Sequence, residues 1–172
     1  MSGPEKACFG ESQNVLIDGP EFARTGGSLR GTIPVAGLER LADLLSARSG
    51  VLAWECVGRQ DRDGRGRIRL RVSGRLEMTC QRCLGALLWS CEVDTEYLLV
   101  GEGAPWPEDD LENAECDAIP ASAGMSLWSM VEDEVLLALP IAPRHQDCRL
   151  PGPDGNKEAT SPFAALAGWK KH

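Results

Sequence analysis

The sequence predicts an α+β domain: an antiparallel sheet, made of a central three-stranded meander plus N-terminal strands, with two longer helices and a short C-terminal helix. Residues 67–78 alternate between apolar and polar side chains, as a strand with one buried face does. An Asp-Gly pair precedes this strand and is a strong hairpin signal. Apolar residues recur at helical spacing in two other segments. A chain of 172 residues suits one domain, which we expect to span residues 1–172.

The N-terminal part predicts short strands and the first of the longer helices. The stretches NVLID (14–18) and SLRGTIPVA (28–36) have the composition of strands. The stretch GLERLADLLSA (37–47) places its leucines on one face, so we expect a helix there.

The meander is predicted from residue 51 to residue 100. The stretch VLAWECVGR (51–59) forms its first strand, QDRDGRG (60–66) its first turn, and residues 67–78 its second strand. Residues 80–85 form the second turn, and LLWSCEVDTEYLLV (87–100) forms the third strand. The apolar side chains of the middle strand face the core, and its arginines face the other way.

The C-terminal part alternates between polar segments and helices. Residues 101–124 are acidic and rich in Pro, Gly and Ala, which predicts a mobile acidic loop with a short strand near CDAIP (116–120). The second longer helix covers SLWSMVEDEVLLALP (126–140), with Ser126 as its N-cap and Pro140 as its stop. Residues 149–160 predict a flexible segment, and SPFAALAGWKKH (161–172) predicts the short last helix.

Composition restricts the class of protein. The formal net charge is −8 and the pI is about 4.8, which argues against indiscriminate binding to nucleic acids. The sequence has no apolar run that spans a bilayer and no secretion signal, so we expect a cytoplasmic protein with no membrane contact. Seven cysteines in such a protein favour free thiols or a metal site over a disulfide framework.

A row of arginines on the middle strand is the first candidate site. Successive residues on one side of a strand lie roughly 7 Å apart, which is comparable to phosphate spacing along a nucleic-acid strand. Guanidinium groups bind phosphate with two hydrogen bonds at once. The pattern therefore predicts contact with an RNA backbone through Arg67, Arg69, Arg71 and Arg75. Two alternatives stay open: an ordinary solvated sheet face, and the binding surface for an acidic protein.

A set of thiols and one imidazole is the second candidate site. Cys80 and Cys83 form a Cys-x-x-Cys pair at a strand end, and His145-x-x-Cys148 follows far downstream. Three thiolates and one imidazole suit tetrahedral zinc, so this set predicts a zinc site. The alternatives are two turn cysteines with an unrelated histidine, or a redox-active pair. Redox motifs of the thioredoxin kind precede a helix, whereas a strand is predicted here.

No catalytic constellation is visible, so we expect no enzyme. The chain has two histidines and lacks the glycine-rich motifs that bind dinucleotides or phosphates. Consecutive carboxylates in the second longer helix point in different directions and make a poor acid–base pair. They predict a solvated face that can bind a partner, formed by Glu132, Asp133 and Glu134.

Three stretches carry a resemblance to a known family. CQRCLG, MVEDEVLLALPIAPRHQDC and PFAALAGWKK together resemble the YceD family of large ribosomal RNA subunit accumulation proteins. The resemblance implies a cytoplasmic bacterial or organellar protein that supports accumulation or processing of large-subunit (23S) ribosomal RNA, and so a role in ribosome biogenesis. The implied motif positions are Cys80, Cys83, Glu132, Asp133, Glu134, Pro140, Pro143, His145 and Cys148.

The sequence leaves the molecular role open between three hypotheses. The favoured one is a non-catalytic factor whose partner is ribosomal RNA or a large-subunit precursor particle. The second is a protein–protein adaptor that recruits a basic partner, such as a ribosomal protein or an RNA-processing enzyme, through its acidic segments. The third is a thiol redox protein that uses Cys80 and Cys83.

Overall fold

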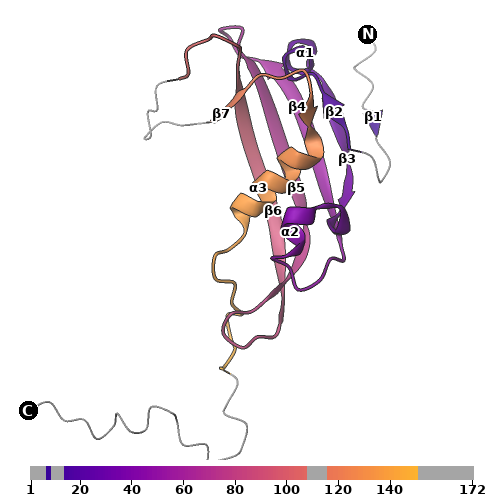
Figure 1. Cartoon of the computed structure of the whole chain (residues 1–172), viewed down its shortest axis with the longest axis vertical. Helices are drawn as coiled ribbons and strands as arrows, with labels where there is room; N and C mark the ends of the chain where they lie inside the picture. The colour runs from indigo at the N-terminus through magenta and orange to yellow at the C-terminus, as the bar shows by residue number, and fades with distance from the viewer. Residues whose placement is uncertain (1–6, 9–13, 108–115, 151–172) are drawn as a thin grey trace, which may run out of the picture.

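The structure is a computed structural model that describes residues 7–8, 14–107 and 116–150. Its main element is a six-stranded sheet in the order β1-β3-β4-β5-β6-β7, with a separate two-stranded pair, β2 and β8 (Figure 1). The sheet is antiparallel in its centre and its helices pack on one face, so the predicted α+β class is confirmed. No helix of the described residues is long and apolar enough to cross a membrane.

The central meander consists of β4 (Val51–Gln60), β5 (Gly66–Thr79) and β6 (Ala86–Val100), as the sequence predicts. The hairpin between β4 and β5 closes where Asp61 N–H donates to the carbonyl of Arg65 at 2.9 Å. Gly64 has a φ of 79°, a left-handed conformation that glycine adopts without strain. The Asp-Gly signal in the sequence therefore marks the turn correctly.

Shorter strands lie at both edges of the meander. β3 (Ser28–Pro34) is antiparallel to β4, and β1 (Ala7–Cys8) runs parallel to β3. At the other edge β7 (Asp117–Pro120) runs parallel to β6, which confirms the short strand predicted near residues 116–120. β2 (Leu16–Ile17) pairs with β8 (Met125–Ser126). Residues 108–115 of the predicted loop lie outside the described residues.

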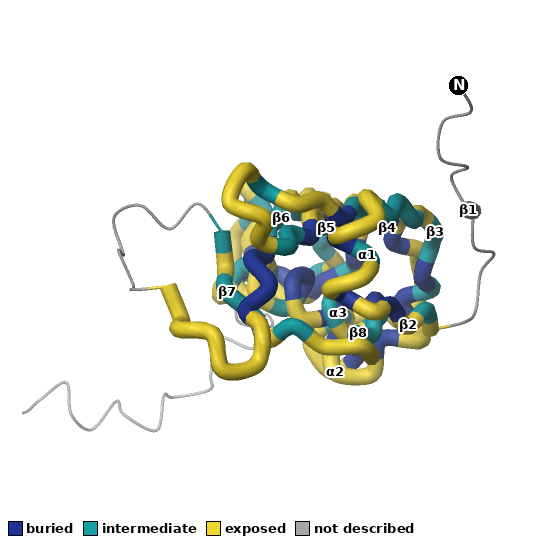
Figure 2. Tube along the Cα trace, turned by 90° about the horizontal axis from the view of Figure 1, so that it is seen from above, coloured by how far each residue is buried: buried dark blue, intermediate teal, exposed yellow. Residues whose placement is uncertain are grey.

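The core lies between the inner face of the sheet and α3 (Leu127–Ala138). Alternate residues of β5 are buried, and they share one apolar cluster with Leu127, Val131 and Val135 of α3. The Ser126 hydroxyl accepts from Ser129 N–H at 3.1 Å and caps this helix, as predicted. Figure 2 shows that buried residues lie between the strands and α3, while the loops at the rim are exposed.

The first predicted long helix is wrong in length. The structure has a 3-10 turn η1 (Val35–Gly37) and then α2 (Glu39–Ala42), which is a single helical turn. Leu38 and Leu41 are fully buried, but Leu44 is 56% exposed, so the leucine stripe does not continue. Ser46 N–H donates instead to the carbonyl of Glu77 on β5 at 2.9 Å. This contact with the sheet edge turns the chain away from the helical path.

Helix α1 (Gly19–Thr25) was not predicted from the sequence. Asp18 caps it by accepting from Glu21 N–H at 2.9 Å, and Pro20 lies in its first turn. Gly26 ends it with a φ of 66°. The helix packs on β4, where Gly58 leaves room for the backbone of Phe22. The predicted C-terminal helix and residues 151–160 of the flexible segment lie outside the described residues, so these predictions stay untested.

Candidate metal centre

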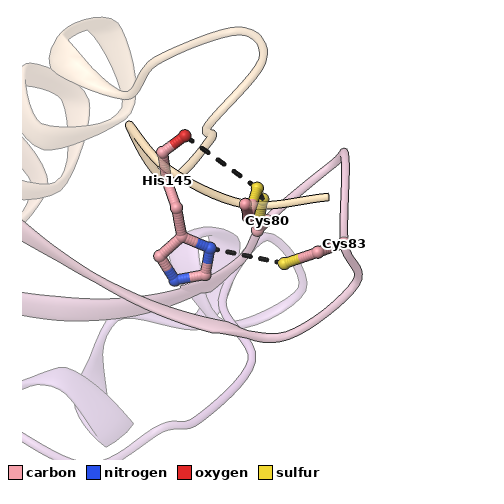
Figure 3. Close-up of side chains that lie close together, drawn as sticks. Cys80, Cys83 and His145 are labelled. Atoms are coloured by element: carbon pink, nitrogen blue, oxygen red, sulfur yellow. Dashed lines mark hydrogen bonds between the residues drawn. The ribbon is translucent and has the colours of Figure 1, made fainter. Parts of the chain in front are cut away.

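Four ligand groups from distant parts of the chain converge at one end of the molecule. One ligand atom from each of Cys80, Cys83, His145 and Cys148 lies within 4.8 Å of all the others. The sulfur atoms of Cys80 and Cys148 are 3.6 Å apart, and Cys83 Sγ lies 3.4 Å from His145 Nδ1. Figure 3 shows the imidazole of His145 directed at the Cys83 sulfur. Sulfur atoms bound to one tetrahedral zinc at about 2.3 Å lie about 3.8 Å apart, so the arrangement fits such an ion.

The turn between β5 and β6 presents the first two ligands. Cys80 N–H donates to the carbonyl of Gly85, and Leu84 N–H donates to the carbonyl of Cys80, both at 2.9 Å. Leu84 has a φ of 60°, which is unusual for a residue with a side chain. Residues 80–85 therefore form a tight knuckle that directs both thiols to the same side.

The segment after α3 supplies the other two ligands and is attached to the knuckle by hydrogen bonds. Gln81 N–H donates to the carbonyl of Pro143 at 2.8 Å. The guanidinium of Arg82 donates to the carbonyl of His145 at 2.6 Å and to that of Gln146 at 3.1 Å. Its Nε also donates to the sulfur of Cys148 at 3.0 Å. Arg82 thus positions both downstream ligands through main-chain and thiol contacts.

The hydrogen bond on the far side of His145 fixes the form of its ring. His145 Nε2 lies 2.9 Å from the carbonyl oxygen of Ala86, which only accepts. Nε2 therefore carries the hydrogen, and Nδ1 presents its lone pair to the thiols. Metal-bound histidines are commonly oriented in this way by a partner for the second nitrogen.

The thiols differ in acidity. Burial alone raises the pKa of Cys80, but hydrogen bonds from the backbone N–H groups of Cys83, His145 and Arg82 outweigh it and lower the pKa to about 5. A hydrogen bond from Gly85 N–H lowers the pKa of Cys83, yet burial and the neighbouring thiols raise it above its ordinary value. The Cys80 thiolate is thus favoured at neutral pH, and the other thiols would lose their protons if a metal were bound.

Two other cysteines pack in the apolar core and take no part in the metal centre. Cys56 and Cys91 are fully buried in the apolar core cluster. Burial raises the pKa of Cys56 to about 12 and that of Cys91 to about 11. Both side chains therefore behave as small apolar groups.

Two of the three carboxylates in the predicted solvated face of α3 are buried, so this part of the prediction is wrong. Glu132 and Glu134 are each only 8% exposed, and both are occupied inside the molecule. Glu134 accepts hydrogen bonds from the hydroxyls of Thr95 and Tyr97 on β6, each at 2.6 Å. Both carboxylates attach α3 to its own domain.

Glu132 holds the helical turn α2 in place. One of its oxygens accepts from the backbone N–H groups of Arg40 and Leu41, at 2.8 and 3.2 Å, and the other accepts from Arg40 Nε at 2.8 Å. The third member of the predicted face, Asp133, is exposed and pairs with Arg40 Nη1 at 2.5 Å. The acidic triplet thus connects α3 to α2 and to β6.

The arginine row lies on the outer face of the sheet, as predicted, but it is not a cationic ridge. Arg69 makes a two-pronged contact with Asp94 of β6 at 2.6 and 2.7 Å. Arg71 lies 3.3 Å from Asp94 and 3.4 Å from Glu55 of β4. Hydrogen bonds from Arg69 are the main cause that lowers the pKa of Asp94 to about 2. Neighbouring strands therefore carry the opposite charges of these two arginines.

The other two arginines of the row differ from each other. Arg67 is half-buried and pairs with Asp61 in the hairpin turn at 3.2 Å. Arg75 is exposed and has no carboxylate within 4.0 Å among the described residues. The face therefore lacks the excess of positive charge from which RNA binding was inferred.

The sequence identified the four ligands but not the residues that orient them. The contacts of Arg82 depend on the path of the chain after α3, which no local pattern gives. The carbonyl of Ala86 has no signature in a sequence. Tyr97 and Thr95 looked like ordinary strand residues, although they hold Glu134.

Comparison with known proteins identifies the family. Neither a curated protein nor a solved structure gives a match to the chain. A family model described as "Large ribosomal RNA subunit accumulation protein YceD" matches residues 68–170, which is more than half of the chain. The matched range contains nearly all of β5, the whole of β6 and α3, and the four converging Cys and His residues. The chain therefore belongs to the YceD family of large ribosomal RNA subunit accumulation proteins.

Proposed function

We propose that this protein is a non-catalytic ribosome-biogenesis factor that acts in the cytoplasm and supports the accumulation of large-subunit (23S) ribosomal RNA. The observation that carries the proposal is the family match over residues 68–170. The expected partner is ribosomal RNA or a large-subunit precursor particle, and a ribosomal protein or an RNA-processing enzyme comes second. The thiol of Cys83 and the imidazole of His145 lie within contact distance, and we assign both to a metal site rather than to catalysis.

The proposal assigns a structural zinc ion to Cys80, Cys83, His145 and Cys148. Three soft thiolates with one imidazole are a donor set that zinc prefers. Four protein ligands leave no open position on a tetrahedral ion, so the ion would bind no substrate. Its contribution would be to fasten the segment after α3 to the knuckle between β5 and β6.

The role in RNA accumulation is tested in cells that lack the gene. Loss of the protein should lower the ratio of large-subunit to small-subunit ribosomal RNA, and the unaltered gene should restore it. Sedimentation of an extract with and without ribonuclease shows whether the protein travels with precursor particles. A normal RNA ratio together with slow sedimentation in both extracts contradicts the proposal.

Zinc is tested on freshly reduced protein by mass spectrometry under native conditions. The unaltered protein should retain one zinc ion, and Cys148→Ser should lose it. Cys91→Ser is the matched control, because this buried cysteine lies in the core cluster and outside the ligand group. A metal-free unaltered protein contradicts the assignment.

A thiol redox function makes the opposite prediction for the same cysteines. It requires a reversible disulfide between Cys80 and Cys83, and no change in ribosomal RNA when both become serine. The presence of His145 and Cys148 within ligand distance favours the metal instead. Thiol trapping after mild oxidation, combined with the RNA ratio, separates the two functions.

Direct RNA contact by the arginine row is a separate prediction. A variant in which Arg67, Arg69, Arg71 and Arg75 all become glutamate should bind RNA more weakly, and binding of the unaltered protein should weaken with salt. Arg67, Arg69 and Arg71 pair with carboxylates, so replacing them also breaks ion pairs within the sheet. Arg75→Glu alone breaks none of these pairs and is therefore the cleaner test of RNA contact. Unchanged RNA binding in both variants means that the row only stabilises and solubilises the sheet.

A further inference from the structure

Strand β6 has a long open edge. It pairs with β5 along Ala86–Leu98, but with β7 only along Tyr97–Val100. Among the described residues no strand pairs with the other side of β6 before Tyr97. In Figure 1, β7 lies beside only the upper part of β6, and the lower part has no strand on that side.

Two hydrogen bonds show which backbone groups point to this edge. The carbonyls of Ala86 and Val100 accept from His145 Nε2 and from Ala121 N–H, which both lie on the side away from β5. Backbone groups alternate along an antiparallel strand, so every second residue between them presents its N–H and C=O to the same side. These open donors and acceptors belong to Leu88, Ser90, Glu92 and Asp94.

A cleft extends along the start of the edge. It has a volume of about 630 Å³ and lies between residues 87–90 of β6 and the segment that follows α3, from Pro140 to Gln146. The cleft therefore gives an incoming chain a second wall beside the open hydrogen-bonding groups.

The side chains along the edge define what fits there. On the inner face, Leu87, Trp89 and Val93 are half-buried, so a neighbouring strand would place apolar residues beside them. On the outer face β6 carries Glu92, Asp94 and Glu96, of which Asp94 pairs with Arg69 and Arg71, and Glu96 pairs with Arg59. Glu92 is exposed and has no ion-pair partner among the described residues. Opposite charges on neighbouring strands stabilise a sheet, and like charges destabilise it.

We propose that the edge of β6 from Leu88 to Asp94 binds an extended segment of a partner protein in which apolar and basic residues alternate. Backbone hydrogen bonds supply affinity, and the two faces of the added strand supply specificity. The inference goes beyond the proposed function, because it names a surface and a class of partner. The metal centre lies at the start of this edge, since the carbonyl of Ala86 holds His145.

Charge disfavours other occupants of the edge. A second copy paired through the same edge would bring the uncompensated carboxylate of Glu92 near its own counterpart. Residues 108–115 of this chain, EDDLENAE, contain acidic residues and no basic one, so they would be repelled in the same way. RNA is polyanionic, so the carboxylate of Glu92 would repel it as well.

The first experiment measures binding of synthetic peptides to the full-length protein. A fluorescent peptide of alternating lysine and valine should bind, and its glutamate–valine counterpart should not. Ser90→Pro removes one open N–H and should weaken binding about tenfold, while Ser90→Thr keeps the N–H and should bind normally. Proline is tolerated on an edge, and unchanged thermal unfolding of Ser90→Pro verifies that the fold is intact.

Charge reversal tests the specificity of the same site. Glu92→Lys should weaken binding of the lysine–valine peptide and allow the glutamate–valine peptide to bind. Glu102→Lys makes the same charge change beyond the end of β6 and should leave both affinities unchanged. Equal binding of both peptides to every variant would overturn the inference.

The second experiment identifies the occupant in cells. A photo-crosslinking amino acid replaces Leu88, which is 67% exposed on the outer face of the edge, and crosslinked sites are mapped by mass spectrometry. Crosslinks to alternating apolar–basic segments of another protein, lost in Ser90→Pro, support the inference. Crosslinks to RNA, to a second copy or to another part of this chain overturn it. The ratio of ribosomal RNA species is recorded in parallel, so failure of the edge is distinguished from failure of the proposed function.

Discussion

At the scale of single residues, the buried carboxylates of α3 explain how short elements hold their place. Helix α2 has no side-chain cap of its own, and its first N–H groups need acceptors. Glu132 supplies one oxygen to the N–H groups of Arg40 and Leu41, so a residue about ninety positions away acts as the cap. The acidic pattern of α3 thus stabilises the domain and is not a solvated surface.

Replacement of Glu132 should destabilise the fold much more than replacement of its neighbour. In Glu132→Gln the amide oxygen can still accept from the backbone N–H groups, but the amide NH2 then faces the Nε–H of Arg40, so a donor meets a donor. We therefore expect a loss of about 1–3 kcal/mol in the free energy of unfolding. Asp133→Asn removes only an exposed ion pair and should cost less than about 1 kcal/mol. Urea unfolding of both variants measures the difference, and equal losses would contradict this role of Glu132.

The ion pairs of the sheet face predict how stability changes in acid. Asp94 has a folded-state pKa of about 2, below the ordinary 3.8, because Arg69 and Arg71 stabilise its charged form. Its contribution is therefore fully present above about pH 4 and is lost as the pH falls toward about 2. In Asp94→Asn, the urea concentration at half-unfolding should fall less steeply over this pH range than in the unaltered protein. A fall identical to that of the unaltered protein would show that other carboxylates dominate.

At the scale of elements, the sequence predicts the strands and turns that depend on neighbouring residues, but not the features that depend on distant ones. The meander followed from strict alternation and from one Asp-Gly turn, since both signals lie within the strands they define. The length of α2 did not follow, because the bond from Ser46 to Glu77 depends on a strand thirty residues away. The pairing of β7 with β6 is also long-range, and no local signal gives its direction.

The same distinction applies to the two candidate sites. The type and spacing of Cys80, Cys83, His145 and Cys148 specified a ligand set, because soft donors have few other reasons to gather. Charges carry no such information, since an exposed arginine and a paired one look alike in a sequence. The row on β5 was therefore assigned correctly to a face, but its neutralisation by β4 and β6 was not foreseen.

The knuckle predicts that Arg82 controls how tightly zinc is held. Arg82→Lys keeps the charge and all four ligands but loses the forked contacts to His145, Gln146 and Cys148. We expect zinc affinity to fall about ten- to hundredfold, as for other residues that orient metal ligands. Competition with a zinc-binding dye measures the change.

Arg144→Lys is the control for this substitution. Arg144 lies beside His145 and is exposed, with no hydrogen bond to a ligand among the described residues. Its replacement should leave zinc affinity unchanged. Equal affinities for Arg82→Lys and the unaltered protein would show that the loop holds its shape without the arginine.

At the scale of the whole molecule, the body and the metal end are stabilised differently. The apolar cluster fills the space between the sheet and α3, whereas Leu84, Ile141 and Leu150 at the metal end are 69%, 98% and 73% exposed. The end therefore depends on hydrogen bonds and on the proposed zinc ion, and the body depends on burial of apolar side chains.

Removal of the metal should loosen one end and leave the body folded. After treatment with a chelator, amide hydrogen exchange should speed up in residues 79–86 and 141–148, while the buried centre of β4 and β5 stays protected. Hydrogen exchange with residue resolution measures both regions. Uniform loss of protection would mean that the ion supports the entire domain, as it does in small zinc-finger domains.

The path of the chain past α3 has a mechanical consequence. Between the end of α3 and Leu150 the backbone is joined to the rest of the molecule through Gln81, Arg82 and the sulfur–imidazole cluster. A pulling force applied beyond Cys148, for example by a protein-unfolding motor, would act on these contacts before it acted on α3. With zinc bound, these contacts would protect α3 from unfolding under a pulling force. The oxidation state of the three sulfur atoms would then determine how much force the domain withstands.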